Sequence, residues 1–164
     1  MSTATLNAPA ILSPEEILKH WQGHRGLTRR VIEAFPEKEL FEFSIGGMRP
    51  FSQLALEAVG IATGIDGMAY GNWTPFEELE AKGNAIKTKE ELLAYWDEVT
   101  EKINAEWSAM TPERFRAREN SWGFFEGPVI DILLYFIDNE VHHRGQGYVY
   151  LRALGIEPPK FYER

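Results

Sequence analysis

The alternation of apolar and polar positions predicts four long amphipathic helices and no strand that competes with them. The expected helices cover residues 13–35, 50–63, 88–107 and 128–154. Capping boxes open the first at Ser13 and the third at Thr88, and Pro36 ends the first. Helices of this length pack most readily as an antiparallel four-helix bundle. The sequence therefore predicts an all-α fold with long connecting loops.

The segments outside these helices predict one domain with a loose start. Residues 1–12 have neither the basic start nor the apolar core of a secretion signal, and we expect a flexible N-terminal tail followed by a single domain over 13–164. Residues 64–85 are rich in glycine and aromatic side chains, which predicts a long loop with one short helical turn. Long loops inside compact domains are more often functional than not.

Composition narrows the class of protein. Of the 164 residues, 44% are hydrophobic and 26% charged, which is ordinary for a soluble globular chain. The absence of cysteine excludes disulfides and thiolate metal sites, and no apolar run reaches the roughly 20 residues that span a bilayer. A net charge of −8 argues against nucleic acid, and we interpret Arg25, Arg29 and Arg30 as a solvated helix face. We expect a cytoplasmic protein without membrane or nucleic-acid partners.

The last expected helix has apolar rows on two sides, which predicts that it is widely buried. One row is Ile130, Leu133, Leu134, Ile137, Val141, Tyr148 and Leu151, and the other is Ile132, Phe136, Asn139, His143, Gly147 and Tyr150. Asn139 and His143 are four residues apart and share a face, a spacing by which helices present two ligands to one ion. His142 points elsewhere.

Glu57 is the expected partner of these residues from the second helix. It falls on an apolar seam with Leu54 and Ile61, so its carboxylate must be paired, metal-bound or at the edge of a cleft. Two interpretations stay open: a hydrogen-bonded polar pair, with Arg144 as a further partner, or a site for Zn, Ni, Mn or Fe.

His20 and His24 also have the four-residue spacing. His24 falls on the apolar stripe of its helix and His20 lies nearer the edge. Because the sequence offers no third ligand, we favour a packing role or a subunit surface for this pair over a metal site.

The segment "NEVHHRGQGYVYLRALGIEPP" resembles the last-helix signature of the DinB-like family of four-helix-bundle metalloproteins. "RPFSQLALEAVG" and "TKEELLAYWDEVTEKINAEWSAMTPERF" are similar to two further segments of that family. The resemblance implies a divalent metal held by three histidines, an activity dependent on low-molecular-weight thiols in some members, and a homodimer. By position, the three ligands fall on Glu57, Asn139 and His143, of which His143 alone keeps the family's residue type.

Three hypotheses follow from this departure from the family pattern. The first is a metal-dependent enzyme, of thiol-dependent transferase or hydrolase type, with Glu140 or Tyr150 in proton transfer. The second is a metal-free protein that binds a small ligand, with residues 68–76 as a gate. The third is a stress-associated dimer without catalytic activity.

Overall fold

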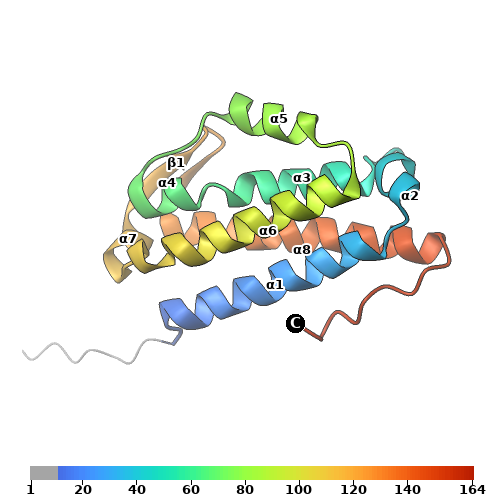
Figure 1. Ribbon diagram of the computed structural model, residues 1–164. Coiled ribbons are helices and arrows are strands. Elements are labelled where there is room, and N and C mark those ends of the chain that lie inside the picture. The colour runs from blue at the N-terminus through green and yellow to red at the C-terminus, as the bar shows by residue number, and fades with distance from the viewer. Residues whose placement is uncertain (1–10) are drawn as a thin grey trace, which may run out of the picture.

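The computed structural model describes residues 11–164 and is mostly helical, with one small sheet (Figure 1). Residues 1–10, and with them most of the expected tail, lie outside the described part of the chain. The elements are α1 (Pro14–Ala34), α2 (Glu37–Glu42), α3 (Phe51–Ala62), α4 (Ile65–Tyr70), α5 (Phe76–Ala85), α6 (Lys89–Glu106), the 3-10 helix η1 (Trp107–Ala109), α7 (Pro112–Arg116), β1 (Arg118–Ser121), β2 (Phe125–Pro128) and α8 (Val129–Ala153).

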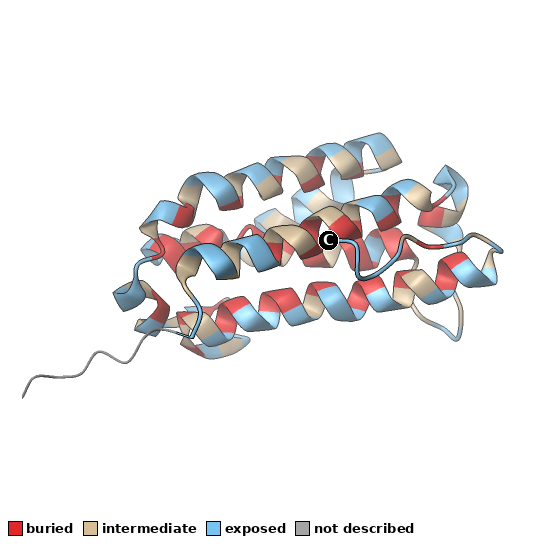
Figure 2. Cartoon of the chain, turned by 90° about the horizontal axis from the view of Figure 1, so that it is seen from below, coloured by how far each residue is buried: buried red, intermediate tan, exposed pale blue. Residues whose placement is uncertain are grey.

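The four expected long helices are present as α1, α3, α6 and α8, each within about one residue of its predicted ends. Both capping boxes form: Ser13 caps α1 and Thr88 caps α6, each with the glutamate three residues on. The apolar side of α6 is buried through Leu92, Trp96, Val99 and Ile103, and Trp107 just after the helix is buried with them. Figure 2 shows how the buried positions of the long helices gather on their inward sides.

The prediction of an all-α chain is wrong at residues 118–128, where β1 and β2 form an antiparallel hairpin. The turn between them contains Trp122 and Gly123, both with positive φ (54° and 77°). Two consecutive residues in this region are typical of the tight turns that join antiparallel strands. The short strands lack an apolar-polar alternation long enough to be recognised in the sequence.

The prediction of a long loop over residues 64–85 is also wrong, because this segment forms α4 and α5. Helix α4 is buried through Ile65 and Met68, whereas α5 has no buried residue and lies on the outside of α3 (Figure 1). The three glycines of residues 64–71 gave the segment the composition of a loop.

The expected wide burial of α8 holds for one of its two rows. Leu134 and Val141 are 48% and 38% exposed, so the outer side of this helix faces solvent. Within the described residues, no helix combines the length and apolar character needed to cross a membrane.

Candidate functional site

The close contact between α3 and α8 sets the register of the candidate site. Gly147 lies against the ring of Phe51 so closely that a Cβ atom there would be 2.5 Å from it. The helices run in opposite directions (Figure 1), so six residues onward from Phe51 and six back from Gly147 bring Glu57 level with residue 141. Glu57 therefore lies opposite Asn139 and His143, which flank that level by two residues on either side.

The three predicted site residues do converge, and they contact one another directly. His143 Nε2 lies 2.9 Å from Glu57 Oε1, and Asn139 Nδ2 donates to the same oxygen at 3.1 Å. The second ring nitrogen, His143 Nδ1, lies 2.9 Å from Gln146 Oε1. The second carboxylate oxygen of Glu57 accepts from Arg49 Nη2 at 2.6 Å. This Glu57–His143 cluster thus consists of Arg49, Glu57, Asn139, His143 and Gln146.

The hydrogen bonds of the cluster favour charged forms of both central groups. The bond from His143, with those from Arg49 and Asn139, lowers the pKa of Glu57 to about 2 despite partial burial. Burial acts to lower the pKa of His143, but the hydrogen bonds to Glu57 and Gln146 outweigh it and raise the pKa above its usual value. The cluster is therefore an ion pair in which a glutamate carboxylate faces an imidazolium.

These residues do not fit a resident divalent metal. Such sites need several anionic or imidazole donors, and the cluster offers one of each. The carboxylate is already paired with the guanidinium of Arg49, and Asn139 turns its amide NH₂ group, a donor, towards Glu57. Among residues 11–164, no group of three His, Asp or Glu side chains is placed to hold a metal ion.

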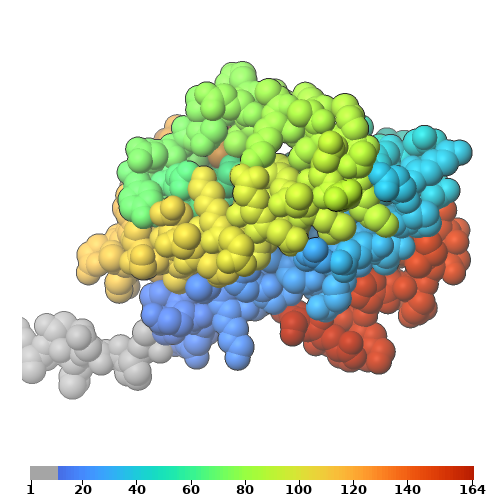
Figure 3. All heavy atoms as spheres, viewed as in Figure 1, coloured from blue at the N-terminus to red at the C-terminus, as the bar shows by residue number. Residues whose placement is uncertain are grey.

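A cleft of about 370 Å³ opens beside the cluster, between α3 and α5. Arg49 and Glu57 lie at its polar end, and its apolar walls are formed by Leu56, Ile61, Phe76 and Leu79. In the space-filling view a small opening is visible beneath the α5 segment (Figure 3). His143 is 7% exposed and lies behind Glu57, so a bound molecule would meet Glu57 and Arg49 first.

Aromatic rings hold the start of α5 in place. Trp122, from the turn of the hairpin, donates to the backbone carbonyl of Thr74 at 2.7 Å. Its ring lies 5.0 Å from that of Trp73 and 6.3 Å from that of Phe76, measured between centroids. Of the predicted gate over residues 68–76, Phe76 lines the cleft, whereas Met68 is buried in α4.

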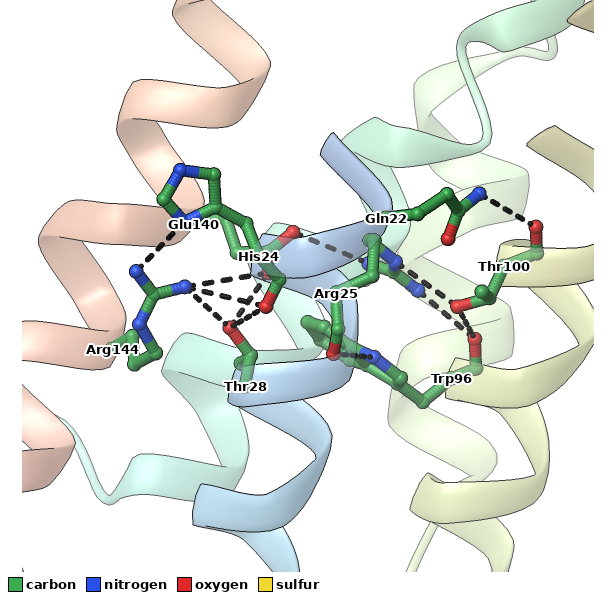
Figure 4. A network of polar contacts seen from close by, with 8 residues as sticks. All are labelled: Gln22, His24, Arg25, Thr28, Trp96, Thr100, Glu140 and Arg144. Atoms are coloured by element: carbon green, nitrogen blue, oxygen red, sulfur yellow. Dashed lines mark hydrogen bonds and ion pairs between the residues drawn. The ribbon is translucent and has the colours of Figure 1, made fainter. Parts of the chain in front are cut away.

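A second polar network lies inside the molecule and corrects the interpretation of Arg25 as a solvated residue. Arg25 is fully buried, with Nη2 donating to the carbonyl of Trp96 at 2.9 Å and Nη1 lying 3.6 Å from Glu140 Oε2 (Figure 4). Arg144 approaches the other oxygen of Glu140 at 3.8 Å, and Thr28 donates to that oxygen at 2.6 Å. Arg29 and Arg30 do lie nearer solvent, as expected.

This buried network also removes Glu140 and Arg144 from the candidate site. Burial raises the pKa of Glu140, against the pull of Arg25, Thr28 and Arg144. The carboxylate is sequestered among these groups and does not contact Glu57 or His143. The hydroxyl of Tyr150, the other expected proton-transfer group, donates to the backbone carbonyl of Arg49 at 2.9 Å. Tyr150 thus helps to position Arg49.

His24 belongs to the edge of the same network. It is buried, and burial, together with the charges of Arg144, Arg164 and His20, lowers its pKa to about 4. Its Nδ1 lies 2.9 Å from Arg144 Nη2, and its Nε2 lies 3.2 Å from both His20 Nε2 and Arg164 Nη1. Both ring nitrogens of His24 thus have partners among the described residues, which favours a packing role for the ring over a metal site.

Arg49 and Gln146 were not predicted from the sequence, and a cleft was expected only as one of the possible settings of Glu57. Arg49 lies just before the start of α3, where the helix dipole disfavours a cation. An arginine at this unfavourable position indicates that a carboxylate lies nearby to pair with it. Gln146 is three residues after His143 and therefore on the same face of α8.

Comparisons with known proteins give a consistent picture. The DinB family model matches residues 1–164. A DinB-like protein from Bacillus cereus ATCC 10987 has a similar fold, with a TM-score of 0.70 and 20% identity, covering 90% of this chain and 97% of that one. A DinB-like protein from Bacillus subtilis gives 0.68 at 20% identity, covering 90% and 99%. A mycothiol-dependent maleylpyruvate isomerase gives 0.62 at 15%, covering 82% of this chain and 60% of that one. No curated protein matches.

Proposed function

This chain belongs to the DinB family, and we propose that it binds a small, partly apolar molecule in the cleft between α3 and α5 without a resident metal. The observation that carries the proposal is that the three expected ligand positions bond to one another, with Arg49 completing the cluster. We describe the helical core that carries the site as an antiparallel four-helix bundle. The expected cytoplasmic location and homodimer stay predictions.

The chemistry of the cleft indicates the kind of molecule that it accepts. Arg49 is half exposed and presents a guanidinium to the cleft, while the ionised Glu57 lies beside it. A molecule with a charged or strongly polar end would bind these two groups, and its apolar part would lie on Leu56, Ile61 and Phe76. A glutamate with a pKa near 2 is a poor proton acceptor at neutral pH, which favours binding over general-base catalysis.

Low-molecular-weight thiols are the first ligand class that we propose. They combine a short chain with carboxylate or other polar ends, and a solved structure with a similar fold is a mycothiol-dependent isomerase. Because the chain has no cysteine, any thiol chemistry at this site would use the sulfur atom of the ligand.

The second candidate is a divalent-metal enzyme using Zn, Ni, Mn or Fe, favoured by the convergence of Glu57, Asn139 and His143 on one point. Asn139 Oδ1 is buried and has no hydrogen-bond partner within residues 11–164. Turning the amide over would present this oxygen to an ion. Such binding would have to displace Arg49 from Glu57 and a proton from His143, so it should be weak and release protons.

A metal titration separates the two candidates. The unmodified protein and the double variant Glu57→His/Asn139→His are titrated with Zn²⁺, Ni²⁺, Mn²⁺ and Fe²⁺ by calorimetry, after purification without chelators and elemental analysis. We expect binding by the three-histidine variant alone. Stoichiometric metal in the unmodified protein, lost in His143→Ala, would overturn the metal-free proposal and support the enzyme.

A thermal-shift series tests the ligand class. Small thiols and their S-methyl analogues are added to metal-free protein, because a ligand that binds the folded state raises the melting temperature. We expect a rise that is lost in Arg49→Gln and retained in Lys160→Gln, which removes an exposed cation near the C-terminus that does not line the cleft. No shift with any member of the series would contradict the assignment to thiols.

A further inference from the structure

The segment that follows α8 turns back along the molecule, and its last residues lie against α1 (Figure 1). Pro158 is buried, and Arg30 Nη2 donates to the backbone carbonyl of Glu163. This contact gives a reason for Gly23 in the middle of α1, because a Cβ atom there would lie 3.1 Å from Arg164 Cβ. The missing side chain of Gly23 thus lets Arg164 lie close to the helix.

An open pocket of about 480 Å³ lies between this segment and the first half of α1. It is lined by Glu16, Lys19, His20, Gly23 and Arg164. The acid, Glu16, belongs to the cap of α1, where it accepts from the backbone N–H of Ser13 at 2.7 Å. Within residues 11–164, neither Lys19 nor Arg164 pairs with a carboxylate side chain. The pocket therefore carries two unpaired cations.

At the inner end of the pocket, hydrogen-bond donors face one another across the ring of His24. Its Nδ1 lies 2.9 Å from Arg144 Nη2 and its Nε2 lies 3.2 Å from Arg164 Nη1. The pKa of His24, lowered to about 4 by burial and by the neighbouring cations, keeps the ring neutral at neutral pH. A neutral imidazole has one acceptor nitrogen, whereas a guanidinium only donates. Whichever nitrogen carries the proton, one of the two arginines therefore faces an N–H group.

An outside molecule reaches this mismatch from the pocket side of the ring. Arg144 is 6% exposed, and its Nη1 donates to Thr28 Oγ1 at 3.0 Å, so its position is fixed inside the molecule. Arg164 is exposed, and so is His20, whose Nε2 lies 3.2 Å from His24 Nε2. Three nitrogen atoms thus converge beside the pocket. An anion with several oxygen atoms would supply the acceptors that this group lacks.

From this arrangement we propose that the pocket binds a small phosphate-bearing molecule, whose phosphoryl group contacts Arg164, His20 and Lys19. A phosphate presents oxygens in several directions, which suits donors that come from two segments of the chain, and a guanidinium binds two of its oxygens at once. The volume of the pocket is typical of small-molecule sites, so an organic group has room beside the phosphate. The inference is independent of the cleft between α3 and α5.

Calorimetry with inorganic phosphate and with phenyl phosphate, at fixed ionic strength, tests the site. The unmodified protein should bind both, and Arg164→Gln should weaken binding by about tenfold or more, because a charge-assisted hydrogen bond is lost. Arg152→Gln removes an exposed arginine from α8 and is the matched control, which should bind as tightly as the unmodified protein. Arg49→Gln should also retain binding, since Arg49 lies at the cleft. No binding by the unmodified protein, or an equal affinity in Arg164→Gln, would overturn the proposal.

The histidine rings report where the phosphate binds. In isotopically labelled protein, the ring signals of His20 and His24 should shift on titration with phosphate, whereas those of His142 and His143 on α8 should not. Gly23→Leu fills the pocket with a residue that also favours the helix, and it should abolish these shifts. Shifts confined to His143 would place the phosphate at the cleft instead, and shifts that persist in Gly23→Leu would contradict binding in the pocket.

Discussion

At the scale of single residues, two carboxylate–cation clusters differ chiefly in their access to water. Glu57 is about one-third exposed, and its pairing with Arg49 and His143 sets the charge at the edge of the cleft. Glu140 is 1% exposed and its pairing with Arg25 is internal. A partly exposed pair contributes less to the free energy of unfolding than is lost when one partner of a buried pair is removed. We therefore assign the first to binding and the second to folding.

The Glu57 cluster predicts a specific pH dependence. The pKa of Glu57 is about 2 in the folded protein and 4.5 ordinarily, so its stabilising effect is present above pH 4.5 and is lost as the pH falls towards 2. After allowance for solvent screening, Glu57→Gln should lower the free energy of unfolding by about 1–2 kcal/mol at pH 7. Urea unfolding at pH 7 and pH 3 should show this difference narrowing.

Glu80→Gln, on the same cleft, is the control and should change the stability little at either pH. A difference between the unmodified protein and Glu57→Gln that is constant with pH would contradict the low pKa of Glu57.

Arg25 and Arg29 lie on the same helix and differ in burial, so the same substitution can be compared at both positions. Arg25→Met removes one of the two cations beside the buried Glu140, leaving Arg144 alone, and should cost about 3–5 kcal/mol. Arg29 binds Asp97 and Glu33 near the surface, so Arg29→Met should lower the free energy of unfolding by about 1 kcal/mol or less. Chemical denaturation of both variants measures the two costs, and equal values would refute the assignment of Glu140 to a structural network.

The convergence of Glu57, Asn139 and His143 could be predicted because periodicity places each on an inward face. The role of Arg25 could not, since an arginine in a helix pattern is usually solvated. Its burial depends on Trp96 and Glu140, which come from helices 71 and 115 residues further along the chain. Long-range pairing of this kind leaves no local pattern.

At the scale of elements, glycines decide how closely the helices pack. Gly147 brings α8 onto Phe51 and fixes the register that aligns Glu57 with His143. A Cβ atom added at Gly26 in α1 would have nothing within 4 Å, so this glycine has no such role.

The two positions should respond oppositely to alanine. Gly147→Ala forces the Phe51 ring to move and should cost about 1–3 kcal/mol. Gly26→Ala improves helix propensity and should stabilise by about 0.5–1 kcal/mol. Thermal unfolding compares them directly. A neutral Gly147→Ala would show that the contact between α3 and α8 is looser than the structure has it.

The helices whose ends are marked by capping residues or prolines could be predicted from the sequence. The two capping boxes and the prolines at positions 36, 50 and 128 placed four helices correctly. Helix α5 was missed because none of its residues is buried and its inward side carries only Phe76 and Leu79, which are too few apolar positions to form a recognisable stripe. The hairpin was missed because four-residue strands are too short for an alternation to register.

At the scale of the whole molecule, the cleft exists because α5 lies outside the hydrophobic core and contributes no buried residue to it. Helix α5 is tied down by the Lys82–Glu98 ion pair and by aromatic contacts at its start, while its body is exposed or half-buried. Segments with few buried contacts open at low free energy. The wall of the binding site is thus the least stable part of its surroundings.

Hydrogen exchange should reveal this difference. Backbone amides of α5 are expected to exchange much faster than those of α3 and α8, and a ligand in the cleft should slow exchange in α5 more than elsewhere. Exchange followed by mass spectrometry measures both effects. Protection of α5 equal to that of α8 would contradict the description of α5 as a separate cover.

The contact between Trp73 and Trp122 also has an optical consequence. Two indole rings 5.0 Å apart and inclined at 76° couple their electronic transitions, which produces paired bands of opposite sign in circular dichroism. Trp122 comes from the hairpin and Trp73 from the segment leading into α5, so the bands depend on both being in place. The protein therefore carries a spectroscopic signal for the position of α5, and Trp122→Phe should remove this part of the spectrum while the contribution of the Trp21–Trp107 pair stays.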